Sequence, residues 1–219
     1  MSTLPARRPL KSRSAAWAQS LARMLLKWGV RPNQVSVASV GSAMIAGAAM
    51  LAATYGSHGP AWLWWILAAV GVQGRLVCNL MDGMLAMEGG LKSATGDVFN
   101  EFPDRLADTA ILVSLGYAGG CATVIAMGWA AACLALMTAS VRLLGASLTA
   151  HHDYRGPMAK PQRMAAVTGC AVLCSAAVLT RQGTWIPALI GVSLAVITAG
   201  AAWTCARRLR SLCATLSSK

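Results

Sequence analysis

Apolar residues fill six long stretches of the chain, and short polar segments separate them. The stretches cover about residues 34–55, 61–87, 95–118, 121–150, 164–181 and 184–206. About 20 mostly apolar residues are enough for a helix to cross the hydrocarbon core of a membrane. Glycine and alanine are frequent within the stretches, as close helix packing in lipid requires. The pattern therefore predicts an all-α integral membrane protein with six transmembrane helices.

A different pattern precedes the first stretch. From Ala15 to Trp28 apolar residues recur at helical spacing, and every charged residue within 1–31 is basic. This pattern predicts an N-terminal amphipathic helix that lies in the membrane interface. The first long apolar run starts only after residue 34, so we do not expect a cleaved signal peptide.

The composition agrees with a membrane protein, and it decides how the net positive charge is interpreted. Of the 219 residues, 56% are hydrophobic and 12% are charged, and the mean hydropathy is +0.55. We therefore expect one membrane domain over residues 1–219, with an interfacial segment (1–31), a six-helix bundle (34–206) and a basic cytoplasmic tail (207–219). The net charge of +12 would suggest nucleic acid in a soluble protein. Beside membrane spans it indicates lipid headgroups as partners, and no nucleic acid.

The distribution of basic residues predicts the orientation. They lie before the first stretch, between the second and third, between the fourth and fifth, and after the sixth, whereas the opposite side has only Arg181. Short basic loops stay on the cytoplasmic side of a membrane. We therefore expect both termini and the even-numbered loops to face the cytoplasm, in the cell (inner) membrane.

Acidic residues are concentrated in the second and third stretches. Of the seven in the chain, all except Asp153 fall in one window: Asp82, Glu88, Asp97, Glu101, Asp104 and Asp108. A carboxylate at mid-membrane depth costs about 2.5–3.5 kcal/mol on insertion scales, so such residues usually mark a functional site. On a helix, the polar residues of the third stretch fall within an arc of about 100°: Asp97, Asn100, Glu101, Asp104 and Asp108.

Two polar faces can meet in this window. Asn79 and Asp82 share one face of the second helix, and an antiparallel third helix would bring its polar stripe against them. Oxygen ligands with few basic neighbours form a divalent-cation site, for which Mg²⁺ or Mn²⁺ is favoured. Glu88 is spaced from Lys92 as a solvated i, i+4 pair. For Arg105, the structural interpretation is an ion pair that neutralises Asp104 or Asp108.

Small residues accompany the acidic ones. Gly83 and Ala86 leave space beside Asp82, and Gly96 begins the third stretch. A metal that binds a pyrophosphate needs such close access to the backbone. Plain helix packing is the alternative for each of the three small residues.

The spacing of these residues resembles the signature of the CDP-alcohol phosphotransferase family. That signature is Asp-x2-Asp-Gly-x2-Ala-Arg-x8-Gly-x3-Asp-x3-Asp. Every interval is kept here, and five positions hold the family's residue type: Asp82, Gly83, Ala86, Gly96 and Asp104. The family's plan of an N-terminal amphipathic helix and six spans also matches, so the resemblance covers nearly the whole chain.

The resemblance implies a reaction and residue roles. The family transfers a substituted phosphate from a CDP-linked donor, usually CDP-diacylglycerol, to an alcohol and releases CMP. Asp82 is then a metal ligand, and Asp104 is the catalytic base or a second-metal ligand. Asn79 and Asn100 occupy the first and third acidic positions, so they are metal ligands by the same resemblance.

The resemblance also implies a nucleotide pocket and partners. Gly83, Ala86 and Gly96 would line the cytidine pocket. A CDP-diacylglycerol-type donor and an alcohol acceptor are the expected substrates, and a homodimer is the expected assembly. The acceptor stays open among glycerol phosphate, inositol phosphate, serine, choline-type alcohols and a second phospholipid.

Three positions depart from the signature. Asn79 and Asn100 replace carboxylates, and Met87 replaces the arginine, so the four acidic positions carry a formal charge of −2 instead of −4. An amide oxygen can ligate Mg²⁺, but it binds more weakly than a carboxylate. We expect one tightly bound metal, or a second that is recruited only with the nucleotide. Asp97 and Glu101 lie on the same stripe and could supply further charge.

The loop between the fourth and fifth stretches is basic and contains two prolines. Positive-inside topology alone would explain its charge. Binding of a substrate phosphate is the alternative, for which the candidates are Arg142, Arg155, Lys160 and Arg163. His151 and His152 are interpreted as interfacial residues and not as metal ligands.

Three functions remain open from the sequence. The first is a lipid-synthesising transferase. The second is a catalytically weakened or inactive family member that binds CDP-lipid or metal without turnover, as the two asparagines and Met87 suggest. The third is a cation or proton pathway, since acidic residues also line transporters. Against the pathway, the acidic residues cluster at one end of the helices and no inverted repeat is visible.

Overall fold

The computed structural model describes residues 15–56, 58–87, 89–91, 95–149 and 153–218. Over these residues the chain is helical and contains no strand. Its elements are α1 (Ala16–Lys27), α2 (Pro32–Tyr55), α3 (Ala61–Met87), α4 (Gly96–Ala118), α5 (Ala122–Thr149), α6 (Lys160–Leu179), the 3₁₀ turn η2 (Gly183–Trp185) and α7 (Ile186–Ser217). The predicted all-α fold class is confirmed.

Each predicted stretch corresponds to one helix from α2 to α7, and five of these are long and apolar enough to cross a membrane. The exception is α4, which has sufficient length but carries Asp97, Glu101, Asp104, Arg105 and Asp108. Five charged residues on one helix lower its hydropathy below that of an ordinary span. The sixth membrane crossing therefore stays a prediction.

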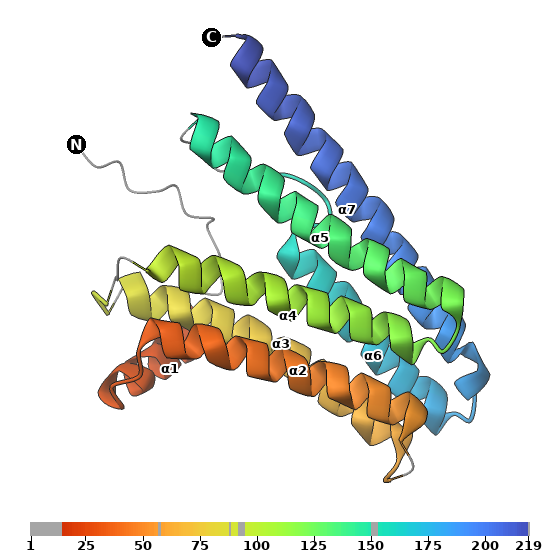
Figure 1. The fold of residues 1–219 in the computed structure, drawn as a ribbon. Coiled ribbons are helices and arrows are strands. Elements are labelled where there is room, and N and C mark those ends of the chain that lie inside the picture. Colours follow the sequence, from red (N-terminus) through yellow and green to blue (C-terminus); the bar gives the residue numbers. More distant parts are fainter. Residues whose placement is uncertain (1–14, 57, 88, 92–94, 150–152, 219) are drawn as a thin grey trace.

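Consecutive helices from α2 to α7 run antiparallel (Figure 1). Within the bundle, α2 packs on α3 and α4, α3 packs on α6, and α5 packs on α4 and α7. Antiparallel order brings the C-terminal ends of α3, α5 and α7 to the same end of the bundle as the N-terminal ends of α2, α4 and α6. The acidic window of the sequence lies at this end.

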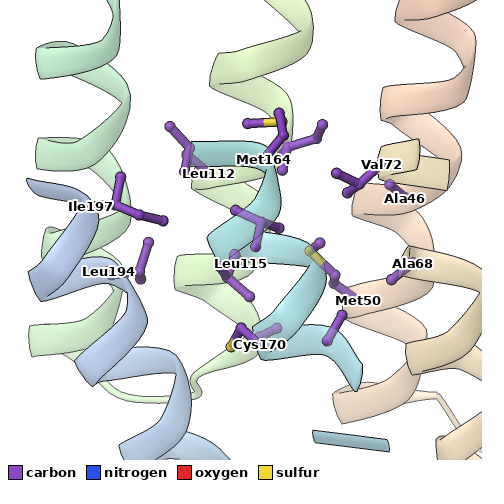
Figure 2. Close-up of a cluster of buried hydrophobic side chains, with 14 of the residues drawn as sticks. Ala46, Met50, Ala68, Val72, Leu112, Leu115, Met164, Cys170, Leu194 and Ile197 are labelled. Carbon is purple, nitrogen blue, oxygen red and sulfur yellow. The ribbon is translucent and has the colours of Figure 1, made fainter. Parts of the chain in front are cut away.

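The apolar core lies where α4 and α6 pass between the other helices. Figure 2 shows Ala46 and Val72 on one side, Leu194 and Ile197 on the other, and Leu115 between them. All five side chains are fully buried. Many of the buried residues are alanine, which lets helix backbones approach closely in a medium where apolar burial alone drives little association.

Two glycines allow α4 and α5 to cross closely. A Cβ atom added at Gly116 would lie 2.9 Å from the Cα of Gly128 and 3.1 Å from the carbonyl oxygen of Val124. Real Cβ atoms do not approach backbone atoms so closely, so a side chain at Gly116 would push the two helices apart.

Replacing Gly116 with alanine is expected to destabilise the protein by about 1–3 kcal/mol, the usual cost of overpacking. Thermal unfolding in detergent micelles measures the effect. Gly41→Ala is the matched control, because a Cβ at Gly41 meets no atom within 4 Å. Equal unfolding temperatures for the two variants would contradict the close crossing.

Helix α1 packs against the end of α3. Its buried residues Ala18 and Ala22 join an apolar cluster with Met81, Met84 and Leu85 of α3. Trp17 and Trp28 stay exposed. Helix α1, with its capping residues, covers the segment from Ala15 to Trp28, and its position in the membrane interface stays a prediction. Residues 1–14 of the predicted interfacial segment lie outside the described residues.

The structure corrects two predicted boundaries. Helix α7 extends past the predicted end of the sixth stretch at residue 206 and continues through the predicted basic tail (207–219) as far as Ser217. Arg208 is buried there and donates hydrogen bonds to the carbonyl oxygens of Thr138 (2.8 Å) and Arg155 (3.0 Å), which fasten this part of α7 to its neighbours. The fifth stretch begins at Lys160 and not at residue 164, since a proline is well tolerated in the first turn of a helix.

Candidate active site

The polar faces of α3 and α4 meet, as the sequence predicts for antiparallel helices. The side-chain amide nitrogen of Asn79 on α3 donates a hydrogen bond to Oδ1 of Asp104 on α4. The two residues are the first and fourth acidic positions of the signature. The structure therefore brings together positions that lie 25 residues apart in the chain.

Asp82 lies one turn further along α3 and is 4% exposed. Its Oδ2 accepts a hydrogen bond of 2.8 Å from Ser36 of α2. Its Oδ1 is buried and has no hydrogen-bond partner among the residues that the structure describes. A buried carboxylate oxygen without a donor is costly, so Oδ1 has the character of an unused ligand position.

Lys160, the first residue of α6, contacts both Asn79 and Asp104. Its ammonium group donates a hydrogen bond of 2.7 Å to the side-chain oxygen of Asn79 and another to Oδ2 of Asp104. The Lys160 side chain keeps 25% of its surface exposed and that of Asp104 keeps 18%. Both side chains are therefore partly open to solvent at this end of the bundle.

Two buried arginines hold Asp108. Arg75 of α3 contacts Oδ1 at 2.5 Å and Arg163 of α6 contacts Oδ2 at 2.9 Å. Arg163 also donates hydrogen bonds to Thr138 (3.2 Å) and to the carbonyl oxygen of Met158 (3.1 Å). The Arg75 side chain is fully buried and the Arg163 side chain is 4% exposed. This ion-pair network joins α3, α4 and α6 about one helical turn from Asn79 and Asp104.

The network corrects the expectation of few basic neighbours. Arg75 also contacts Oδ1 of Asp104 at 3.3 Å. Asp104 therefore has two cationic neighbours, Arg75 and Lys160. Sequence reasoning missed Arg75. A signal was present, because Arg75, Asn79 and Asp82 are spaced i, i+4, i+7 and so share one helix face.

Glu101 belongs to a second charged cluster. Arg142 of α5 binds both of its carboxylate oxygens, at 2.7 and 2.8 Å, and Arg105 contacts it at 3.0 Å. Arg105 therefore pairs with Glu101 and not with Asp104 or Asp108 as the sequence suggested. The guanidinium of Arg142 also lies 5.8 Å from the ring centre of Tyr154, within range of a cation–π contact.

The remaining predicted residues lie around this centre. Asp97 and Asn100 are exposed on the first turns of α4, which begins at Gly96. Gly83 and Ala86 are partly exposed on α3. Four residues of the predictions lie outside the described part of the chain: Glu88, Lys92, His151 and His152.

Arg155 lies apart from the cluster, in the connection between α5 and α6. It is 62% exposed and contacts Asp153 at 3.0 Å and Ser211 at 2.6 Å. Partial burial raises the pKa of Asp153, but hydrogen bonds from Arg155 outweigh it and hold that pKa below its usual range. This ion pair is exposed to water, so it contributes little to stability.

The comparison with known proteins rests on structure. A scan against protein-family models and a search of curated proteins gave no match. The chain is similar to the crystal structure of Mycobacterium tuberculosis phosphatidylinositol phosphate synthase (PgsA1) with CDP-DAG bound, with a TM-score of 0.70 and 19% sequence identity over 90% of this chain and 94% of that chain. For the same synthase in complex with manganese and citrate, the TM-score is 0.69 and the identity 17%, over 89% of this chain and 88% of that chain.

The chain has the fold of this synthase. The resemblance to the CDP-alcohol phosphotransferases, made from the signature, is thereby confirmed at the level of the fold.

Among the described residues, the contacts of Asp82 and Asp104 leave one carboxylate oxygen as a ligand atom for a divalent ion. Oδ1 of Asp82 is an available ligand atom. Both oxygens of Asp104 already accept hydrogen bonds, from Arg75, Asn79 and Lys160. Across the described residues no group of three or more His, Cys, Asp or Glu side chains is placed to hold a metal. A divalent ion at Asp82 would take its remaining ligands from water or a bound ligand.

Proposed function

We propose that the protein is a CDP-alcohol phosphotransferase. It would move the phosphatidyl group of CDP-diacylglycerol, or of a similar CDP-linked lipid, to the hydroxyl group of an alcohol and release CMP. One observation carries the proposal. Asn79 and Asp104, two positions of the signature, are in contact within a fold that matches a CDP-DAG-bound synthase over 90% of the chain.

The proposed reaction assigns a task to each acidic residue. Asp104 takes the proton of the acceptor hydroxyl, whose oxygen forms a bond to the phosphorus of the phosphatidyl group as the bond to the CMP oxygen breaks. Asp82, with Asn79 and Asn100 near it in the signature, would hold a divalent ion. Bound Mg²⁺ or Mn²⁺ would neutralise charge on the pyrophosphate oxygens; the manganese complex of the similar synthase supports this class of ion.

Small residues of the signature complete the proposed site. Gly83, Ala86 and Gly96 would leave room for the nucleotide beside Asp82. Arg142 and Arg163 are engaged with Glu101 and Asp108, so we assign them the task of positioning α4 against α5 and α6. We do not assign the substrate phosphate to either of them.

The membrane arrangement follows the sequence prediction. We propose that α2 to α7 cross the membrane, with the site and both termini on the cytoplasmic side of the cell membrane and α1 in the interface. Exposed Trp17 and Trp28 on α1 support an interfacial position, since tryptophan prefers that depth. A homodimer is the assembly that the resemblance suggests.

The test is turnover by purified protein. The protein in detergent micelles receives CDP-diacylglycerol, Mg²⁺ or Mn²⁺ and a pool of polar alcohols, and CMP release is measured together with mass spectrometry of the lipids. Release that requires Asp82 and Asp104 supports the proposal, and the product lipid identifies the acceptor. Binding of the donor without release of CMP would contradict it.

A further inference from the structure

Lys160 occupies a position of special interest in the candidate site. Its ammonium group lies between the side-chain oxygen of Asn79 and Oδ2 of Asp104, within hydrogen-bond distance of both. A lysine ammonium is a compact positive charge that accepts no hydrogen bonds. It therefore contacts the same kind of oxygen atoms, from the same two helices, that would ligate a metal ion.

The formal charge of the four signature positions is consistent with a cationic Lys160 beside Asp104. The four signature positions carry a formal charge of −2, because Asn79 and Asn100 are amides. One divalent ion at Asp82 together with the ammonium group of Lys160 would already exceed that negative charge. A second divalent ion at Asp104 would have to lie beside Lys160 and would be repelled by it.

We infer that Lys160 supplies, from within the chain, the positive charge that a second divalent ion would bring, so that the protein binds a single divalent ion at Asp82. The amides at Asn79 and Asn100 and the ammonium group of Lys160 then have the same explanation, since both reduce the negative charge that a second ion would neutralise. A contact between the Lys160 ammonium group and the pyrophosphate of a substrate rests on the proposed function. The number of divalent ions that the protein binds does not rest on it.

The ammonium group also has capacity for a ligand. It has three N–H donors, of which Asn79 and Asp104 use two. The side chain is 25% exposed, and the third donor would be left for a phosphate oxygen of a bound CDP-linked lipid.

Counting Mn²⁺ ions tests the inference without any turnover. Metal-free protein in detergent is titrated with Mn²⁺, and loss of the free-ion signal in electron paramagnetic resonance gives the number bound per chain. We expect one tight ion in the wild-type protein. We also expect one in the double variant Asn79→Asp/Asn100→Asp, because Lys160 would neutralise an added carboxylate. The triple variant that adds Lys160→Met should bind two.

Two comparisons keep the test decisive. Lys27→Met removes an exposed lysine of α1 that lies outside the site, and in the double-variant background it should leave one bound ion. Two tight ions in the wild-type protein, or in the double variant with Lys160 intact, would overturn the inference even if the triple variant failed to fold. One ion in a folded triple variant would also overturn it. Absence of CMP release with this pattern of ion counts would contradict the proposed function alone.

Discussion

Asp104→Asn is expected to lower the rate of CMP release about 10²–10⁴-fold, the usual contribution of a positioned general base. Asparagine has nearly the same shape, and its single side-chain oxygen can replace either Oδ1, which contacts Arg75, or Oδ2, which contacts Lys160. It cannot take the proton of an acceptor hydroxyl. The measurement is the initial rate of CMP release by purified protein with CDP-diacylglycerol and a saturating pool of alcohols.

Asp153→Asn is the matched control for this variant. It makes the same chemical change at an aspartate that pairs with exposed Arg155 and lies apart from Asp82 and Asp104. We expect its rate to stay within a few-fold of the wild-type rate. If Asp104→Asn keeps the wild-type rate, or loses activity only in proportion to the protein that unfolds, Asp104 is not the base.

Asp108→Asn is expected to cost about 3–5 kcal/mol of folding stability, the usual result of removing one partner from a buried ion pair. Arg75 and Arg163 are almost completely buried, and each makes its closest carboxylate contact with Asp108. A neutral side chain there would leave two buried guanidinium groups without adequate compensation. Equilibrium unfolding of the detergent-solubilised protein measures the loss.

Glu101→Gln is the comparison for Asp108→Asn. It removes a carboxylate charge on the same helix, but Glu101, Arg105 and Arg142 each keep about a fifth of their side-chain surface in solvent, so water can replace part of the lost interaction. We expect a clearly smaller loss of stability. A loss for Asp108→Asn that is equal or smaller would show that the buried network does not hold α3, α4 and α6 together.

The helices were predictable because their signal is local. Long apolar runs and the short polar segments between them locate α2 to α5 to within a few residues. The end of α7 was missed because its last turns mix Arg207, Arg208 and Arg210 with apolar residues, which resembles a soluble tail. What extends the helix is tertiary: buried Arg208 binds carbonyl oxygens of two other segments.

The sequence named the acidic residues and also Lys160 and Arg163, but it missed Arg75 and did not predict that Lys160 and Arg163 contact Asp104 and Asp108. Signature spacing identified Asn79, Asp82 and Asp104 because a helix face can be worked out from residue intervals. Lys160 lies 56 residues from Asp104, and its charge alone agrees equally well with positive-inside topology. Only the packing of α6 against α3 shows that the lysine faces the signature residues.

The central claim is phosphatidyl transfer, and tracing the phosphate tests it most directly. CDP-diacylglycerol carrying ³²P in the phosphate next to diacylglycerol is incubated with the protein in liposomes, and the labelled lipids are separated with time. We expect ³²P to pass into a new phospholipid with one CMP released per product, and Asp82→Asn and Asp104→Asn to lower the rate of this transfer sharply. Label that stays in CDP-diacylglycerol, or that is found only in phosphatidic acid through hydrolysis, would contradict it.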